Sequence, residues 1–214
     1  MTEDRKELFD RWATDYDATV AEAGPTDFPF VGYEQVLEEL VRWSDVHPHM
    51  RVLDLGVGTG NLAARFLDLE CEVVGLDFSD EMLGKTRLKF PTLRLVQADL
   101  LHKWPAELDQ AFDRVVSAYV FHEFDLSSKM MLLQRLTSRH LSPDGSALIA
   151  DIAFPTSQAR EAASRRWART WDPDEYYWAA DETIALCKEV GLGVRYKQVS
   201  SCAGIFNFTA NAAG

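Results

Sequence analysis

The segment 52–63, VLDLGVGTGNLA, constrains the fold more than any other part of the chain. It passes directly from an apolar run through a glycine-rich turn into a helical pattern. Three alternating glycines, Gly56, Gly58 and Gly60, allow a tight turn and a close approach of the backbone to a ligand, because a Cβ atom would intrude there. The first N–H groups of the following helix lack partners within that helix and face the same ligand. The segment therefore predicts a strand, a cofactor-binding loop and a helix in immediate succession.

Acidic residues near this loop narrow the choice of ligand. Asp54 precedes the turn, where a carboxylate repels a pyrophosphate but can hold an ammonium group, directly or through water. A dinucleotide loop of the pattern G-x-G-x-x-G that begins at Gly56 requires a glycine at position 61, where the chain has Asn61. Asp77 follows the next apolar run, 72–76, and a carboxylate at that place accepts hydrogen bonds from a ribose diol. Taken alone, Asp77 could equally cap the helix expected after it.

A third carboxylate, Asp99, follows the third apolar run, 93–97, where it could accept a hydrogen bond from an adenine amino group. The chain thus carries three motifs in order: the glycine loop with Asp54, then Asp77, then Asp99. Their order and spacing resemble those of the class I S-adenosylmethionine-dependent methyltransferases. The resemblance implies an α/β fold with a doubly wound, Rossmann-like sheet of seven strands, mostly parallel with an antiparallel C-terminal strand.

The same resemblance implies S-adenosylmethionine as the cofactor. Asp54 would lie near its methionine end, Asp77 on its ribose and Asp99 near its adenine. The other expected cofactor contacts come from the loop, from apolar residues around the adenine and from the end of the fourth strand: Gly56, Gly58, Gly60, Phe78, Met82, Leu100 and Ala118.

Length, composition and charge limit the kinds of partner. With 214 residues, of which 47% are hydrophobic, the chain can bury a substantial core, and we expect a single domain over residues 1–214. The net charge of −12 argues against nucleic acid, whose phosphates are bound by clustered Lys and Arg. No apolar run approaches the roughly 20 residues that cross a membrane, and the charged N-terminus lacks the apolar core of a secretion signal. We therefore expect a cytoplasmic protein.

Strand and helix patterns alternate regularly along the chain, which favours an α/β fold. Strands are expected at 51–55, 72–76, 93–97, 112–118, 146–152, 194–199 and 205–209. Helical spacing covers 3–20, 33–43, 62–69, 81–90, 127–140 and 181–190. Pro91 and the sequence Pro143-Asp144-Gly145 supply stops.

Two regions are expected to border the substrate: an N-terminal helical lid at 1–45 and a helical, aromatic insertion at 153–180. In the lid, Trp12 and Tyr16 share one helical face, where they could pack the helix onto the body or face the sulfonium of the cofactor. Tyr16 is therefore one catalytic candidate. The aromatic residues within 167–178 could form a pocket wall, pack helices together or form the face of a homodimer.

The end of the fourth predicted strand should face the methyl group, because ligands bind at the carboxyl ends of such strands. Its sequence, SAYV at 117–120, lacks the Asn/Asp-Pro-Pro-aromatic motif of enzymes that methylate amino groups of bases. It also lacks the cysteine of cytosine C5 enzymes and the carboxylate with which catechol-type enzymes hold a metal. No metal is expected at this position. None is expected at His47, His49, His102 or His140 either, because these residues lack partners at ligand spacing.

His122 is the second catalytic candidate, as a proton acceptor, because imidazole titrates near neutral pH. It could instead hydrogen-bond the backbone near the adenine or cap the loop. Glu123 is a weaker candidate, and methyl transfer by positioning alone needs no base.

Three short patterns narrow the resemblance further: aromatic and acidic residues in 9–17, FHE at 121–123 and EYY at 175–177. Together they resemble the YrrT-like group of bacterial class I methyltransferases, although Glu123 stands where a second histidine would be expected. We predict a methyltransferase that transfers the methyl group of S-adenosylmethionine to a small-molecule acceptor by direct in-line displacement. Two alternatives remain at this point: a nicotinamide-dependent oxidoreductase, against which Asn61 counts, and a non-catalytic protein that binds S-adenosylmethionine or S-adenosylhomocysteine.

Overall fold

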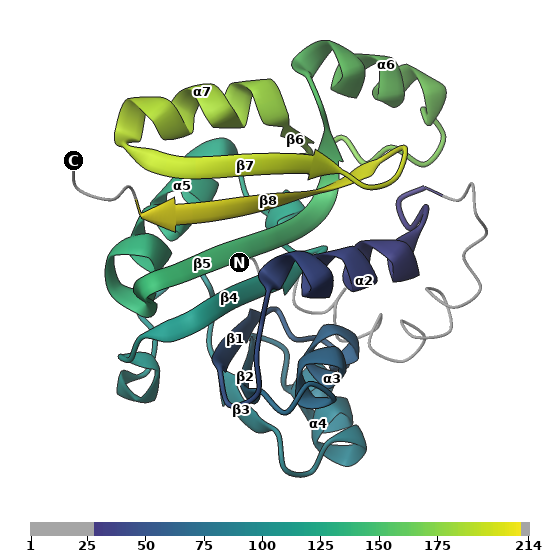
Figure 1. The fold of residues 1–214 in the computed structure, drawn as a ribbon. Helices are drawn as coiled ribbons and strands as arrows, with labels where there is room; N and C mark the ends of the chain where they lie inside the picture. The colour runs from purple at the N-terminus through teal and green to yellow at the C-terminus, as the bar shows by residue number, and fades with distance from the viewer. Residues whose placement is uncertain (1–27, 211–214) are drawn as a thin grey trace.

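Seven strands form the central sheet in the order β3-β2-β1-β4-β5-β8-β7 (Figure 1). The computed structural model describes residues 28–210. The strands are β1 (Arg51–Leu55), β2 (Glu72–Asp77), β3 (Arg94–Gln97), β4 (Phe112–Ala118), β5 (Leu141–Phe154), β7 (Leu192–Gln198) and β8 (Ala203–Ala210). Neighbouring strands from β3 to β5 run parallel, whereas β8 is antiparallel to both β5 and β7. This is the doubly wound sheet with a reversed C-terminal strand that the sequence predicts.

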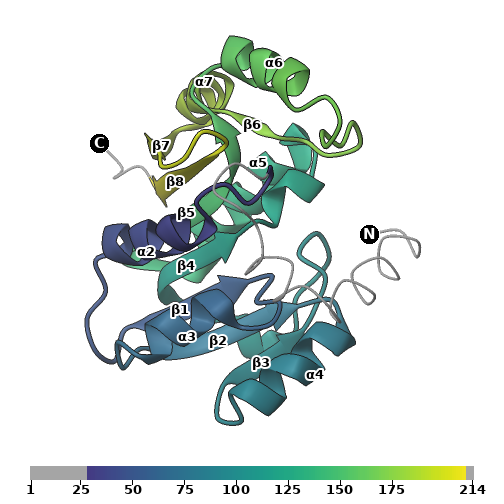
Figure 2. The ribbon, with the colours of Figure 1, turned by 90° about the vertical axis from the view of Figure 1, so that its right-hand side faces the viewer.

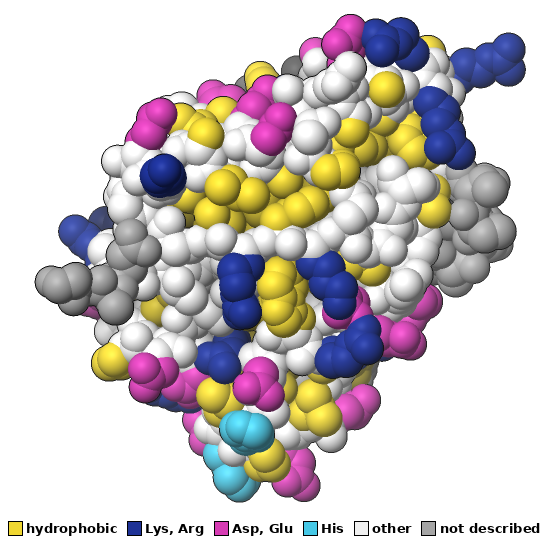
Figure 3. All heavy atoms as spheres, turned by 45° about the horizontal axis from the view of Figure 1, so that its top comes forward, with side chains coloured by type: hydrophobic (Ala, Val, Ile, Leu, Met, Phe, Trp, Pro, Cys, Tyr) yellow, Lys and Arg dark blue, Asp and Glu magenta, His cyan; other side chains and the backbone are white. Residues whose placement is uncertain are grey.

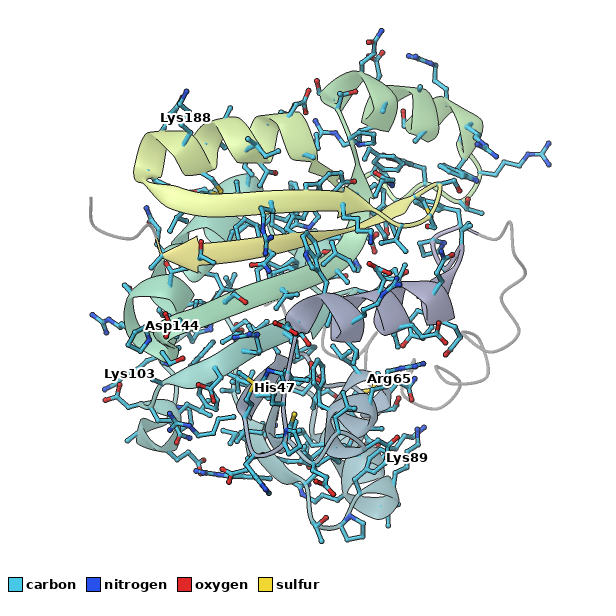
Figure 4. All side chains as sticks on the ribbon, in the orientation of Figure 1. His47, Arg65, Lys89, Lys103, Asp144 and Lys188 are labelled. Atoms are coloured by element: carbon cyan, nitrogen blue, oxygen red, sulfur yellow. The ribbon has the colours of Figure 1, made fainter. Side chains whose placement is uncertain are left out.

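Helices cover both faces of this sheet, which explains why its inner strands are apolar on both sides. Val52 of β1 packs toward α2 (Tyr33–Ser44), α3 (Asn61–Leu67) and α4 (Asp80–Lys89), while its neighbour Leu53 packs toward α5 (Leu126–Arg135) and α7 (Ala180–Val190). Figure 2 shows α2 and α3 together on one side of the strands. An ion pair between Arg65, labelled in Figure 4, and Glu34 joins α3 to α2.

The junction between α5 and β5 differs from the prediction. A single helix was expected over 127–140. The α-helical part ends at Arg135, and a π-helical turn, Leu136–His140, follows it. β5 then begins at Leu141, before the expected 146, and bulges so that Phe112 pairs with Leu141 but Arg114 pairs with Ser146. A Cβ at Gly145 would lie 3.0 Å from the carbonyl oxygen of Phe112, so the glycine predicted as a stop is the residue that lets the bulge close against β4.

The expected insertion at 153–180 contains α6 (Ser157–Arg166) and a two-residue strand, β6 (Trp178–Ala179), which pairs with β5 and was not predicted. The expected helix 3–20, with Trp12 and Tyr16, lies outside the described residues. Within 28–210, no helix combines the length and the apolar character needed to cross a membrane.

Candidate functional site

A pocket opens at the carboxyl ends of β1, β2 and β4, where the order of the strands reverses. The chain leaves β1 toward β2 and β3 on one side, and later leaves β4 toward β5 on the other. Such a reversal opens a crevice in which open α/β sheets bind ligands. The empty space, with its open mouth, amounts to about 850 Å³. Its lining is Tyr33, Asp54, Gly56, Val57, Gly58, Thr59, Asn61, Leu62, Asp77, Phe78, Met82, Leu100, Ala118, Tyr119, Val120, Glu123 and Phe124.

The three loop glycines differ in what surrounds them, although all have positive φ. A Cβ on Gly56 would lie 2.4 Å from Val120 Cγ2, and one on Gly60 would lie 2.9 Å from the ring of Phe90. A Cβ on Gly58 would meet no atom closer than 3.9 Å, because this residue borders the pocket. Gly56 and Gly60 are therefore required by packing, whereas Gly58 keeps space open for a ligand.

Asp54 is a buried carboxylate at the floor of this pocket. The residue is 1% exposed, and its Oδ2 accepts no hydrogen bond from any described residue. Burial and the nearby charge of Asp77 raise its pKa to about 8, although a hydrogen bond with the backbone of Ala63 acts in the opposite direction. A cationic group placed in the pocket would supply the missing partner, because it favours the charged form of the carboxylate.

Asp77 ties the loop to the end of β2. Its Oδ2 accepts a hydrogen bond from the Gly58 N–H at 2.9 Å, and its Oδ1 accepts one from the Ser79 N–H at 2.9 Å. The alternative role as the cap of α4 belongs instead to Ser79, whose hydroxyl accepts from the Met82 N–H at 3.2 Å. Because each carboxylate oxygen has two lone pairs, Asp77 can still accept hydrogen bonds from a ligand.

Two predicted contacts, Gly60 and Asp99, lie outside the pocket lining. Gly60 begins α3 and packs on Phe90. Asp99 turns toward its own loop, where Oδ1 accepts from the Leu101 N–H at 2.8 Å and Oδ2 lies 3.0 Å from His102 Nδ1. The eight other predicted cofactor residues line the pocket. An adenine contact by Asp99 stays a prediction.

Tyr119 lines the pocket, although no role was predicted for it from the segment 117–120 beyond the absence of a metal-binding carboxylate. It follows β4 with a φ of 56°, a left-handed conformation that non-glycine residues rarely adopt. Its hydroxyl is buried and finds no partner among residues 28–210, and its ring centroid lies 5.3 Å from that of Tyr33. Tyr33 and Tyr119 thus form an aromatic wall that no local pattern indicates.

His122 lies beside the pocket rather than in its lining. It is 8% exposed, and its Nδ1 is 2.7 Å from Asp151 Oδ1. On the other side of the ring, Nε2 lies 3.7 Å from Glu123 Oε1 and 3.8 Å from Glu175 Oε1. Burial alone would lower its pKa, but Asp151 and the two glutamates raise the pKa to about 9. An imidazole in this environment holds its proton at neutral pH, so it can accept one only after releasing its own. The other catalytic candidate, Tyr16, lies outside the described residues.

The aromatic residues within 167–178 have two kinds of surroundings. Trp178 is core: it is 1% exposed, lies 4.9 Å from the ring of Phe206 and donates from Nε1 to Asp151 Oδ2 at 3.0 Å. Trp171 stacks on Phe28 and, with Tyr176, Tyr177 and Trp178, also lines a second pocket next to the first. The segment therefore packs the body and forms a pocket wall; the homodimer face stays a prediction.

Basic side chains do not gather into one continuous surface on the face shown in Figure 3, where Asp and Glu lie between separate Lys and Arg positions. On α6, Arg160 donates to the carbonyl oxygen of Tyr177 and pairs with Glu182, and Arg165 pairs with Glu161. These arginines are thus neutralised by neighbouring acids.

Comparison with known proteins identifies relatives along almost the whole chain. Residues 52–145 match the model of a methyltransferase domain. A Bacillus subtilis protein named as uncharacterized methyltransferase YrrT is 34% identical over 202 residues, covering 89% of this chain and 91% of that protein. The YrrT protein of Halobacillus halophilus is 29% identical over 205 residues, with 92% and 93% covered.

Solved structures share the fold at lower identity. The structure described as a DhpI-SAM-HEP complex superposes with a TM-score of 0.72 at 18% identity and covers 97% of this chain and 99% of its own. Magnesium protoporphyrin IX methyltransferase (ChlM) from Synechocystis PCC 6803, with bound SAH, also gives a TM-score of 0.72 at 18% identity, with 95% and 96% covered. The glycine-loop pocket therefore lies in a fold that is found in other proteins in complex with SAM or SAH.

Proposed function

The chain belongs to the YrrT-like group of class I S-adenosylmethionine-dependent methyltransferases, and from this premise we propose that it methylates a small molecule by direct in-line displacement. The sequence left two alternatives, a nicotinamide-dependent oxidoreductase and a non-catalytic binding protein. Membership of this family counts against both, because the relatives are named as methyltransferases. The acceptor and the mode of transfer are the parts that we propose.

The proposal starts from the placement of the cofactor, and one observation carries that placement: the buried Oδ2 of Asp54, without a partner among the described residues, in the lining of the glycine-loop pocket. The methionine end of the cofactor carries an ammonium group that would satisfy this oxygen, directly or through water. The cofactor supplies an electrophilic methyl group on a sulfonium. The protein has to orient that methyl group and an acceptor in line and exclude water.

The other lining residues divide into positions suited to each part of the cofactor. Asp77 would accept from the ribose hydroxyls, and Gly58 leaves space for close approach of the backbone. Phe78, Met82 and Leu100 would enclose the adenine. Ala118 lies at the end of β4, next to the aromatic wall of Tyr33 and Tyr119, whose electron-rich rings can stabilise a sulfonium.

A small acceptor agrees with the charge and shape of the protein. The net charge of −12 and the paired arginines disfavour a polyanion. The second pocket, beside the first, offers an aromatic wall that includes Trp171 and Tyr176, with side chains of both charges such as Glu175 and Arg160. Such a wall suits a small molecule better than an extended polymer.

The test follows the methyl group. The purified protein is incubated with S-adenosylmethionine labelled in its methyl group and with fractions of a cell extract separated by size. We expect label in the fraction of low molecular mass. Label that enters protein or RNA instead would overturn the small-molecule proposal. Asp54→Asn should reduce transfer at least about tenfold through weaker cofactor binding, whereas the exposed Asp144→Asn should not.

A further inference from the structure

Three side chains with metal-ligating atoms meet at the border of the two pockets. His122 and Glu123 belong to the short helical turn η2 (Phe121–Glu123), and Glu175 comes from the segment before β6. The Tyr176 N–H donates to the carbonyl oxygen of His122 at 2.7 Å, so a backbone hydrogen bond holds the segment with Glu175 against η2. The convergence is therefore fixed by the main chain and not only by side-chain charge.

The imidazole is oriented so that Nε2 faces the two glutamates. Asp151, a residue of β5, accepts a hydrogen bond from His122 Nδ1 at 2.7 Å. This carboxylate is itself fixed, because Trp178 Nε1 donates to it at 3.0 Å and the Ile152 N–H at 2.8 Å. A carboxylate that holds one imidazole nitrogen while the other points at oxygen ligands is the usual second layer of a histidine metal site.

The spacing of the ligand atoms fits an ion after a small contraction. One atom each from His122, Glu123 and Glu175 lies within 4.8 Å of the others, and Nε2 is 3.7 and 3.8 Å from the two carboxylate oxygens. Ligand atoms about 2.1 Å from one ion lie roughly 3.0–3.5 Å apart. Rotations of the two glutamate side chains can supply that difference.

We propose that His122, Glu123 and Glu175 bind a divalent transition-metal ion, which takes the place of the proton on His122 Nε2, and that this proton is released to solvent. The donor set of one imidazole and two carboxylates favours Zn²⁺ or Mn²⁺ over Ca²⁺ and Mg²⁺, which prefer oxygen ligands alone. Three protein ligands leave open positions on the ion. Because Glu123 lines the cofactor pocket and Glu175 lines the second pocket, an open position would hold an oxygen or nitrogen atom of the acceptor; this last step rests on the proposed function.

The sequence predicts no metal because the segment 117–120 carries no carboxylate and the histidines other than His122 lack partners at short ligand spacing. Glu175 reaches the site only through the fold, since it follows His122 after α5, β5 and α6. A long-range contact of this kind has no local signature.

Metal binding is tested on the full chain after removal of ions by a chelator. The protein is dialysed against Zn²⁺ alone or Mg²⁺ alone, and its metal content is measured by mass spectrometry. We expect one Zn²⁺ per chain and no stoichiometric Mg²⁺. Glu175→Gln should weaken Zn²⁺ binding at least about tenfold, and Asp151→Asn by about 10–100-fold through loss of the imidazole's orientation. Glu189→Gln, an exposed glutamate on α7, is the matched control and should bind like the original protein.

Thermal unfolding gives a second readout that separates a lost site from a damaged fold. Zn²⁺ should raise the midpoint of the original chain and of Glu189→Gln but not of Glu175→Gln, while S-adenosylhomocysteine should stabilise all three. Failure to bind Zn²⁺, or equal binding by Glu175→Gln and Glu189→Gln, would refute the site. If Zn²⁺ binds as expected but label never reaches a small molecule, the metal site stands and the proposed function falls.

Discussion

A single carboxylate, Asp54, links the site to the stability of the protein. Its pKa in the folded protein, about 8, is above the value of 3.8 for an unperturbed aspartate, so folding takes up a proton between these pH values. The free energy of unfolding without cofactor should therefore fall as the pH rises through this range. Asp54→Asn removes this loss and should stabilise the ligand-free protein, by a few kcal/mol, at about pH 8 but not at about pH 4.

Urea unfolding of the original chain and of Asp54→Asn at both pH values measures this effect. The exposed Asp144→Asn, in the bulge of β5, is the control and should show no pH-dependent gain. An equal difference between Asp54→Asn and the original chain at both pH values would mean that Asp54 stays charged in the fold.

The loop glycines Gly56 and Gly58 should respond differently to the same substitution. Gly56→Ala should destabilise the protein by about 2–5 kcal/mol, because left-handed strain adds to a clash with Val120. Gly58→Ala should cost only the strain, about 1–2 kcal/mol, yet weaken cofactor binding at least about tenfold. Unfolding curves and calorimetric titration with S-adenosylhomocysteine compare the two variants. A stable Gly58→Ala with unchanged affinity would place the cofactor away from this residue.

Trp178 is one of the two residues of strand β6, and we expect its side chain to hold that strand in place. This side chain fills the core against Phe206 and donates to Asp151. Trp178→Phe would keep much of the apolar contact but remove the donor, which should cost about 1–3 kcal/mol. Trp171→Phe, on a half-buried residue that packs against the rings of Phe28 and Tyr177, should cost less than about 1.5 kcal/mol. Urea unfolding checks both, and similar losses would show that the hydrogen bond to Asp151 adds nothing.

The elements also show what the sequence can and cannot predict. β1, β2 and β4 were predictable because each is a short apolar run that ends in a turn or an acid, and the sites of Asp54 and Asp77 follow from those ends. β6 was missed because two residues carry no periodicity. The π-helical turn after α5 keeps the apolar spacing of a helix, so it could not be separated from one.

The remaining site residues depend on contacts between distant parts of the chain. Tyr33 begins a helix and Tyr119 follows a strand, and only the folded sheet brings their rings together. Glu175 meets His122 in the same way. For Asp99, the sequence predicted the position after β3 but not the contact. Its carboxylate accepts a hydrogen bond from the adjacent loop, and the spacing of residues alone does not reveal where a side chain points.

The cofactor should stabilise the whole folded chain against unfolding. A ligand that binds only the folded chain adds about 2.7 kcal/mol to the free energy of unfolding when its concentration is 100 times its Kd. S-adenosylhomocysteine should therefore raise the unfolding midpoint of the original chain, and Asp77→Asn should reduce that rise at equal ligand concentration. NADH provides the matched negative ligand. A rise with NADH, or an undiminished rise with Asp77→Asn, would contradict the assignment of the ribose position.

The two neighbouring pockets draw on different stretches of the chain. The first is lined entirely from residues 33–124 and the second entirely from residues 126–183. Under the proposed function, the residues that bind the cofactor therefore precede those that bind the acceptor in the chain, and His122 and Glu123 lie near the point where the two stretches meet. A relative could exchange the later stretch, and with it the molecule that receives the methyl group, while inheriting the earlier stretch unaltered.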